Sequence, residues 1–132
     1  MEGLPPYYFR VKDNGALVYR VETGDRHRRL ELAQIANVNV NSGAVKPHGE
    51  TALTAEDEAA IAEWLTARRA ALAARDLDDI HRAIDHLNLT AHWAQSRATD
   101  AELEAVTDRL LLAMHDLRSV LARKRADRLE RE

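Results

Sequence analysis

Apolar and polar residues alternate with a period of two in the first third of the chain. The segments YYFRV and ALVYRVE flank DNG, a pattern of aromatic and β-branched residues around a turn that is typical of a β-hairpin. A second alternating run has the apolar members Leu30, Leu32, Ala36, Val38 and Val40. The pattern predicts an antiparallel β-meander of four to five strands over about 7–46, with one apolar face that requires a cover.

The register of the first hairpin can be predicted from its apolar positions. A two-residue Asn-Gly loop would place Phe9 opposite Arg20. A three-residue loop, Asp13-Asn14-Gly15, instead gives apolar pairs, which are Val11 with Leu17, Phe9 with Tyr19 and Tyr7 with Val21. Because matched apolar pairs build one buried face, we predict the three-residue loop, with Gly15 in the left-handed conformation at a bulge.

That register predicts a basic face on the other side of the hairpin. The face carries Tyr8, Arg10, Lys12, Val18 and Arg20, and the segment DRHRR at 25–29 follows nearby. Cations beside an aromatic ring are the mixture that holds phosphates and stacks single-stranded bases. The candidate nucleic-acid face is therefore Tyr8, Arg10, Lys12 and Arg20. Acidic residues interrupt the same segments, and an exposed sheet face commonly carries charge for solubility alone.

The rest of the chain has the periodicity of helices. Thr54 precedes three acidic residues and an apolar stripe, which is the signal of a capped helix start. Asp76 offers a fresh N-cap and predicts a break near residue 75. Thr99 and Glu102 have the spacing of a capping box, which predicts another helix start. The expected helices span about 54–74, 76–95 and 99–128.

The last two expected helices carry a heptad-like seam. Apolar residues recur in steps of three and four from Leu77 to Ala94 and again from Leu103 to Val120, so we expect an antiparallel helical hairpin. The third helix is apolar beyond this seam, and such a helix needs partners on two sides. The second sector is the candidate dimer or partner interface, with Leu89, Trp93, Leu111, Leu112, Met114 and Leu121. It packs either within the chain or on a second copy, and both alternatives stay open.

Glycine and proline divide the chain at one place. All five glycines and all three prolines lie in residues 1–49. A β-meander region, 1–49, is therefore expected to precede a helical region, 50–132, within one compact domain from which the hairpin projects. The first region carries seven Lys and Arg against five Asp and Glu, and the second twelve against seventeen, so +2 and −5 sum to the net −3. No dominant field favours nucleic acid or membrane.

The chain contains no cysteine, which excludes disulfides, thiolate metal sites and cysteine nucleophiles. Its N-terminus lacks the basic and apolar signature of a secretion signal, and no apolar run is long enough to cross a bilayer. A cytoplasmic location without membrane contact is the resulting expectation.

Histidines supply one metal hypothesis. The stretch IHRAIDHLNLTAHW at 80–93 holds three of the six histidines. Asp85 lies one helical turn from His81, and an antiparallel hairpin would bring His115 near both, so these three are candidate ligands for zinc, nickel or iron. The expected core positions are aliphatic and Glu-x-x-His is missing, so a solvated helix edge is the preferred interpretation. We predict no metal and no cofactor.

No catalytic constellation emerges, because no serine lies in a Gly-x-Ser-x-Gly elbow and no glycine-rich loop leads into a helix. The sequence therefore predicts a small non-enzymatic protein that forms a homodimer through its helical hairpin and acts as an adaptor or regulator of an unidentified protein partner. A nucleic-acid-associated regulator that uses the basic sheet face is the alternative. A metal-binding helical hairpin is the third hypothesis.

Overall fold

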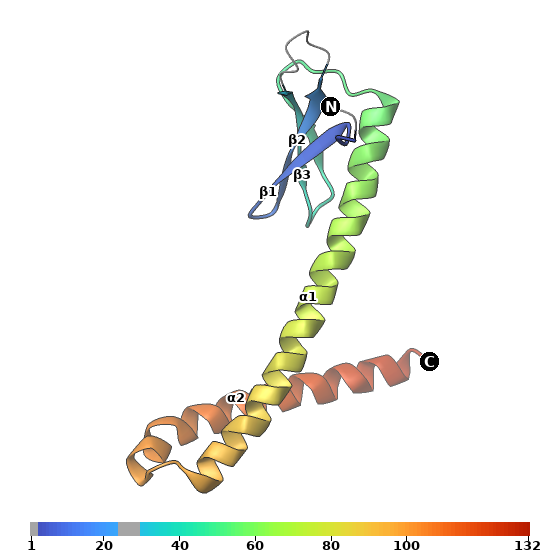
Figure 1. Ribbon diagram of the computed structural model, residues 1–132. Helices are drawn as coiled ribbons and strands as arrows, with labels where there is room; N and C mark the ends of the chain where they lie inside the picture. Colours follow the sequence, from blue (N-terminus) through green and yellow to red (C-terminus); the bar gives the residue numbers. More distant parts are fainter. Residues whose placement is uncertain (1–2, 24–29) are drawn as a thin grey trace. The chain divides into compact units, whose positions relative to one another are not determined.

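The computed structural model describes residues 3–23 and 30–132, which form one antiparallel sheet and two helices (Figure 1). The strands are β1 (Tyr7–Lys12), β2 (Gly15–Glu22), β3 (Glu31–Asn39) and β4 (Val45–Pro47), and they lie in the order β1-β2-β3-β4. The helices are α1 (Ala55–Ser96) and α2 (Asp100–Glu130). The predicted α+β chain, with a meander before helices, is confirmed. The prediction of three helices is wrong, because the described residues form two.

The helix α1 runs without interruption past residue 75, where the sequence predicts a break. Its 42 residues include Asp76, which is exposed. An exposed Asp in a helix interior costs at most about 0.7 kcal/mol relative to Ala. The flanking residues are mainly Ala, Leu and Arg, with neither glycine nor proline among them. Since the neighbours favour helix and Asp76 opposes it only weakly, the possible cap at Asp76 is not used.

The predicted helix starts at Thr54 and Thr99 are confirmed. The backbone N–H of Asp57 donates to Thr54 Oγ1 at 3.1 Å. The N–H of Glu102 donates to Thr99 Oγ1 at 3.2 Å, and the N–H of Thr99 donates to the Glu102 carboxylate at 2.9 Å. These reciprocal bonds hold the pKa of Glu102 below its ordinary value. Capping thus fixes the point at which α2 begins.

The observed β1–β2 register differs by one residue from the prediction. Phe9 pairs with Val18 and Lys12 pairs with Gly15, so the loop has two residues, Asp13 and Asn14. The backbone of β3 explains why glycine is needed at position 15 within a strand. A Cβ on Gly15 would lie 1.8 Å from the Val38 carbonyl oxygen. Gly15 therefore serves close backbone approach, and the predicted left-handed bulge at this residue is wrong.

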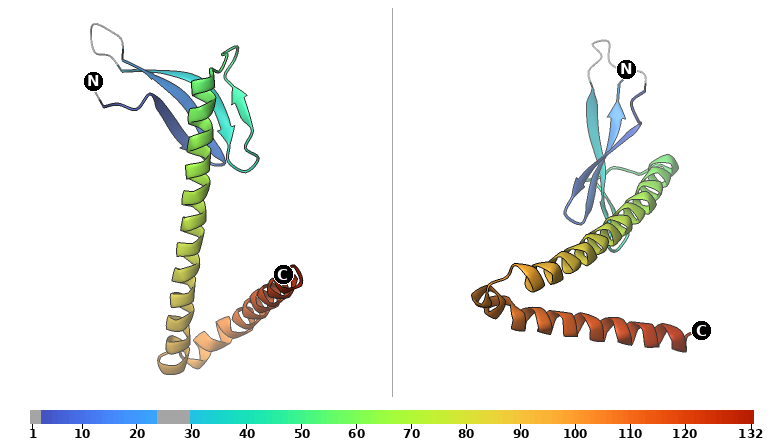
Figure 2. Two further views of the ribbon diagram at one scale, coloured as in Figure 1. Left: turned by 90° about the vertical axis from the view of Figure 1, so that its right-hand side faces the viewer. Right: turned by 60° about the horizontal axis from the view of Figure 1, so that its bottom comes forward.

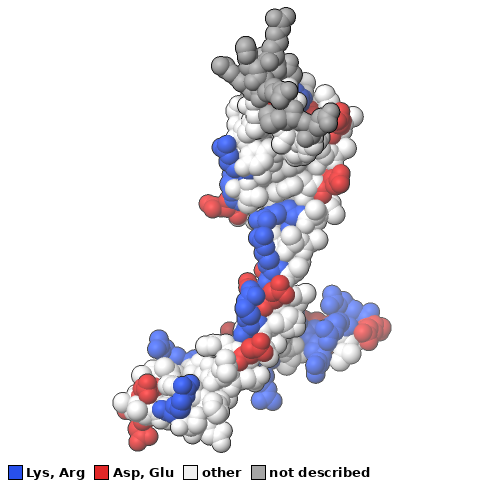
Figure 3. Space-filling model, viewed as in Figure 1, with Lys and Arg blue, Asp and Glu red and all other residues white. Residues whose placement is uncertain are grey.

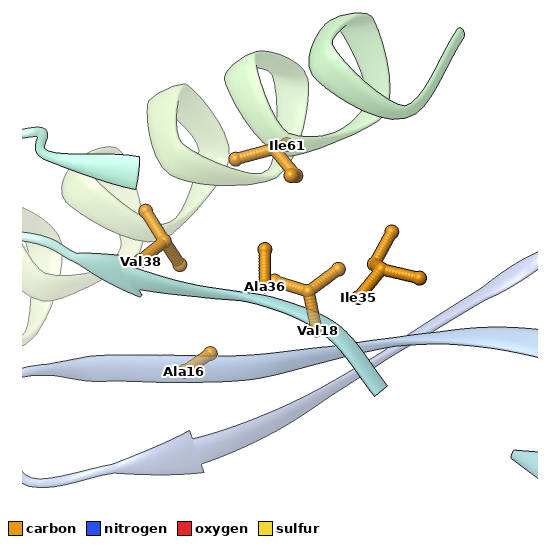
Figure 4. Packing of buried hydrophobic residues seen from close by; sticks show 6 residues of the cluster. All are labelled: Ala16, Val18, Ile35, Ala36, Val38 and Ile61. Carbon is orange, nitrogen blue, oxygen red and sulfur yellow. The ribbon is translucent and has the colours of Figure 1, made fainter. Parts of the chain in front are cut away.

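A bulge lies on β3 instead. Val18 pairs with Ala36 and Tyr19 with Gln34, which leaves Ile35 as an extra residue. Ile35 and Ala36 consequently both point toward α1, as Figure 4 shows, and both are buried. The extra residue reverses the alternation on its N-terminal side, so Leu30 and Leu32 remain exposed. The prediction that these two leucines share the buried face with Val38 is wrong.

The core lies between one face of the sheet and the start of α1 (Figure 2). It consists of the buried residues Ala16, Val18, Ile35, Ala36, Val38 and Ile61 (Figure 4). The rings of Phe9 and Trp64 stack beside it, with centroids 5.0 Å apart and planes inclined by 4°. The first turns of α1 thus supply the cover that a one-sided sheet requires.

The chain forms two compact units, Met1–Asp79 and Ile80–Glu132. The first contains the sheet and the start of α1, and the second contains the rest of α1 together with α2. The connection from α1 to α2 spans the three residues 97–99. Across the described part of the chain, neither helix combines the length and apolar content that a bilayer crossing requires. The predicted hairpin packing of the two helices stays a prediction.

Replacing Gly15 by Asn discriminates between the two registers. In the observed register the new Cβ meets the Val38 carbonyl, so we expect the free energy of unfolding to fall by roughly 1–3 kcal/mol, as in overpacked cores. Gly49→Asn is the matched control, because Gly49 has a φ of 57° and nothing within 4 Å of an added Cβ, and Asn tolerates left-handed backbone. Urea unfolding of both variants measures the difference. Equal stability of the two would favour the three-residue loop.

Candidate functional site

A buried carboxylate joins the sheet to α1. Asp57, in the first turn of α1, is 1% exposed and accepts hydrogen bonds on both oxygens. Its Oδ1 accepts from the Tyr7 hydroxyl at 2.6 Å and from Arg20 Nε at 3.2 Å. Its Oδ2 accepts from the Thr54 N–H at 2.9 Å and forms an ion pair with Arg20 Nη2. We call these four residues the Asp57 cluster.

The electrostatics of the Asp57 cluster follow from this geometry. Hydrogen bonds from Arg20, Tyr7 and Thr54 hold the pKa of Asp57 far below its ordinary value and outweigh the opposing effect of burial, with Arg20 having the largest effect. Burial, together with the hydrogen bond to Asp57, raises the pKa of Tyr7 to about 12. The ion pair with Asp57 raises the pKa of Arg20. The cluster is thus a fixed charge pair at neutral pH.

The Asp57 cluster has a structural role. Both carboxylate oxygens are occupied by donors from the chain itself, so the group has no free position at which to act as a base on a bound molecule. Sequence reasoning placed Asp57 among the acidic residues of a helix start and missed its link to the sheet. The Thr-x-x-Asp spacing was the available signal, but the partners Tyr7 and Arg20 lie 50 and 37 residues away in sequence.

Because the register differs from the prediction, Arg20 lies on the helix-covered face and not beside Tyr8, Arg10 and Lys12. The opposite face of the sheet is the open face. Its strand residues are Tyr8, Arg10, Lys12, Gly15, Leu17, Tyr19, Val21, Leu32, Gln34, Asn37, Asn39 and Lys46. The predicted nucleic-acid set thus keeps three of its four members together. The segment 25–29, predicted to lie near them, falls outside the described residues.

The open face has an aromatic centre. The rings of Tyr8 and Tyr19 have centroids 5.9 Å apart, and the Arg10 guanidinium carbon lies 5.0 Å from the centroid of the Tyr19 ring. Tyr19 is covered by this arrangement, whereas Tyr8 remains 43% exposed. Beside them a shallow pocket of about 420 Å³ is lined by Lys12, Asp13, Asn14, Asn37, Asn39 and Lys46, among others. The face therefore offers ring surface, amide groups and cations.

The helical unit, residues 80–132, presents a second surface. No residue of α2 is buried. Five of the six predicted interface residues are exposed, from 53% for Met114 to 69% for Leu112, and Trp93 is half-buried. The exposed five are Leu89, Leu111, Leu112, Met114 and Leu121. A groove of about 650 Å³ between the helices is lined by Leu87 on α1 and by Met114, Leu117 and Leu121 on α2, with basic residues at its border.

Charge is polarised along α2. Residues 100–112 carry four acidic residues and one basic residue, a net charge of −3, while residues 113–130 carry five basic and three acidic residues, a net charge of +2. Figure 3 shows Lys and Arg side chains gathered over the C-terminal half of this helix. Such an arrangement complements the helix dipole, and it also gives the helix two ends of opposite sign.

The metal hypothesis finds no support in the described residues. Within 3–23 and 30–132, no three His, Asp or Glu side chains come together as a group that could hold a metal ion. The candidates His81, Asp85 and His115 are all exposed on helix surfaces. The structure therefore does not assemble the three candidate ligands into a metal centre.

Comparison of the chain with protein-family models, with curated proteins and with solved structures gave no match.

Replacing Asp57 by Asn should flatten the response of the protein to acid. The folded-state pKa of Asp57 is depressed, so its contribution is present above the unfolded-state pKa and is lost as the pH falls from about 5 toward 2. At neutral pH we expect Asp57→Asn to lower the free energy of unfolding by about 3 kcal/mol, the low end of the range for breaking a buried pair, because Arg20 is partly exposed. Glu58→Gln, an exposed change in the same turn, is the control. Identical slopes in this pH window would contradict the assignment.

Tyr7 gives a separate prediction at alkaline pH. The pKa of Tyr7 is raised from 10.0 to about 12 in the folded protein. Its contribution to the free energy of unfolding is therefore present below pH 10 and is lost as the pH rises from about 10 to 12. Tyr7→Phe should abolish that part of the loss and should cost stability at neutral pH through the missing bond to Asp57. Urea unfolding at several alkaline pH values measures both effects. Tyr8→Phe, on the open face, should leave the alkaline slope unchanged.

Proposed function

We propose that this protein is a non-enzymatic assembly or adaptor protein that forms a homodimer through its helical unit. The observation that carries the proposal is that α2 contains no buried residue, although large apolar side chains recur along its length. Exposed apolar surface on this scale is characteristic of interaction sites rather than of isolated monomers. The cytoplasmic location and the protein partner expected from the sequence belong to the same proposal.

The exposed apolar surface is large enough to support association. The helical unit has ten large apolar side chains that are exposed, with fractions from 43% for Leu87 to 69% for Leu112. Burial of a Leu-sized side chain contributes about 1.5–3 kcal/mol, so covering the remaining half of ten such side chains contributes on the order of 10 kcal/mol. Association costs about 4–15 kcal/mol in lost freedom of motion. The apolar term is therefore of the size that a specific dimer requires.

The distribution of charge along α2 favours a second copy of the chain as the partner that covers its apolar surface. An antiparallel pairing of α2 with the α2 of another copy places the acidic half of each helix against the basic half of the other. A parallel pairing would bring like charges together. The antiparallel arrangement is self-complementary and closes with two-fold symmetry, which is the commonest symmetry of homodimers. The polarised charge thus selects both the partner and the orientation.

The end of α1 completes the proposed interface. Ile80, Ile84 and Leu87 are exposed and lie three and four residues apart, so they form a stripe on one side of the helix. In the dimer each copy contributes this stripe and α2, which gives four helices around one apolar centre. This is the arrangement in which the predicted hairpin would form. The sheet unit is not needed for the contact and remains available for a partner.

Charge exchange on α2 tests the proposal. Size-exclusion chromatography with light scattering at about 100 μM should give the mass of a dimer. Lys124→Glu combined with Arg125→Glu should weaken the dimer at least tenfold, because both changes place acid against the acidic half of the other copy. Adding Glu104→Arg and Asp108→Arg to that variant should restore the dimer, because complementarity returns with reversed sign.

The controls separate a specific interface from a general effect of charge. Arg75→Glu combined with Arg97→Glu changes the net charge by the same amount outside α2 and should leave the mass of the dimer unchanged. Leu117→Asp should give a monomer whose sheet unit still unfolds cooperatively. A wild-type protein that is monomeric at about 100 μM would overturn the proposal. Equal weakening by the control pair would overturn the antiparallel α2 contact.

A further inference from the structure

We propose that the open face of the sheet binds single-stranded nucleic acid, with Tyr8 and Arg10 stacking bases and Lys12 and Lys46 holding phosphates. The inference is independent of the proposed dimer, because it rests on the sheet unit alone. It also departs from the sequence-based set of four residues, since Arg20 is replaced by Lys46.

The first argument is that Arg20 is not available for a ligand. Its guanidinium is paired with Asp57 on the helix-covered face. The register places Lys46 on the open face instead, in a row that runs across all four strands. That row is Arg10, Leu17, Asn37 and Lys46. Two cations therefore stand at the ends of one row, with an amide and an aliphatic side chain between them.

The second argument is the sign of the charge. The open face has three cations at its strand positions, Arg10, Lys12 and Lys46, and no acidic residue among the described strand positions of that face. The acidic residues of the same strands, Glu22 and Glu31, pair with each other on the other face. A face made polar for solubility alone mixes both signs. The open face carries only positive charge at its strand positions, with no ion pair among them, so it complements a polyanion.

The third argument is the shape of the face. Tyr8 presents ring surface, and Arg10, whose guanidinium carbon lies 5.0 Å from the centroid of the Tyr19 ring, is exposed and adds a second group that can stack on a base. The pocket of about 420 Å³ beside them is lined by Lys12, Lys46 and the amides of Asn14, Asn37 and Asn39, with Asp13 as its one acidic residue. Amide N–H groups and ammonium groups are donors for phosphate oxygens. Stacking surface beside phosphate donors is what single strands require, whereas a duplex does not expose the faces of its bases.

Fluorescence anisotropy with a labelled single-stranded 20-mer, oligo(dT) or oligo(U), tests the proposal with the full chain. Two phosphate contacts predict a slope of about −1.4 in log K against log salt. Lys12→Gln combined with Lys46→Gln should weaken binding and bring that slope close to zero. Tyr8→Ala should weaken binding about tenfold with the slope unchanged, because stacking releases no counterions.

Two controls make the outcome decisive. Arg75→Gln combined with Arg97→Gln removes two exposed cations elsewhere and should leave the affinity unchanged. A duplex of the same length should bind more weakly than the single strand. The proposal is overturned if the single strand does not bind at 50 mM salt, or if the Lys12 and Lys46 changes leave the slope at its wild-type value. It is equally overturned if polyglutamate binds as tightly as the oligonucleotide and Tyr8→Ala has no effect, since the face would then serve an acidic protein segment.

Discussion

The position of α1 on the sheet depends on one buried carboxylate. Asp57 receives donors from β1, from β2 and from the start of its own helix, and a charge with so little access to water must keep all of them. The aliphatic core around Ile61 is small and its attraction has no direction. Burial of that core stabilises the contact between helix and sheet, while the geometry of the Asp57 cluster selects one arrangement among several that would bury similar area.

The sequence predicts those parts of the structure that depend on neighbours in the chain. The meander, the helix starts at Thr54 and Thr99 and the apolar second sector of α2 all follow from local spacing. The register of the first hairpin does not follow from local spacing. The sequence DNG is compatible both with a glycine in the left-handed conformation and with a glycine packed against another strand. The contact between Gly15 and the Val38 carbonyl decides between them, and it joins residues that are distant in sequence. The bulge at Ile35 could not be predicted either. One extra residue reverses which side chains of β3 face the helix, and the composition of the strand gives no sign of it.

The candidate sites were predictable to different degrees for the same reason. Leu111, Leu112 and Met114 are exposed apolar residues of a single helix, so periodicity alone locates them. The composition of the open face depends on the register of the strands. Because the predicted register was wrong by one residue, Arg20 was assigned to the open face, although it lies on the helix-covered face. The metal hypothesis required two helices to place His81, Asp85 and His115 together, and the described residues contain no such group. Apart from the helix break expected near residue 75, the predictions that required correction were those that join distant residues.

The strand order also determines how the sheet can grow. Its free edges are β1 and β4, because β2 and β3 are each paired on both sides. β4 has three residues and ends at Pro47, which has no N–H to offer to a further strand. β1 follows Pro5 and Pro6 and carries two cations, features that discourage an incoming strand. Neither edge is a good template for strand addition, so the fold resists open-ended polymerisation through its sheet.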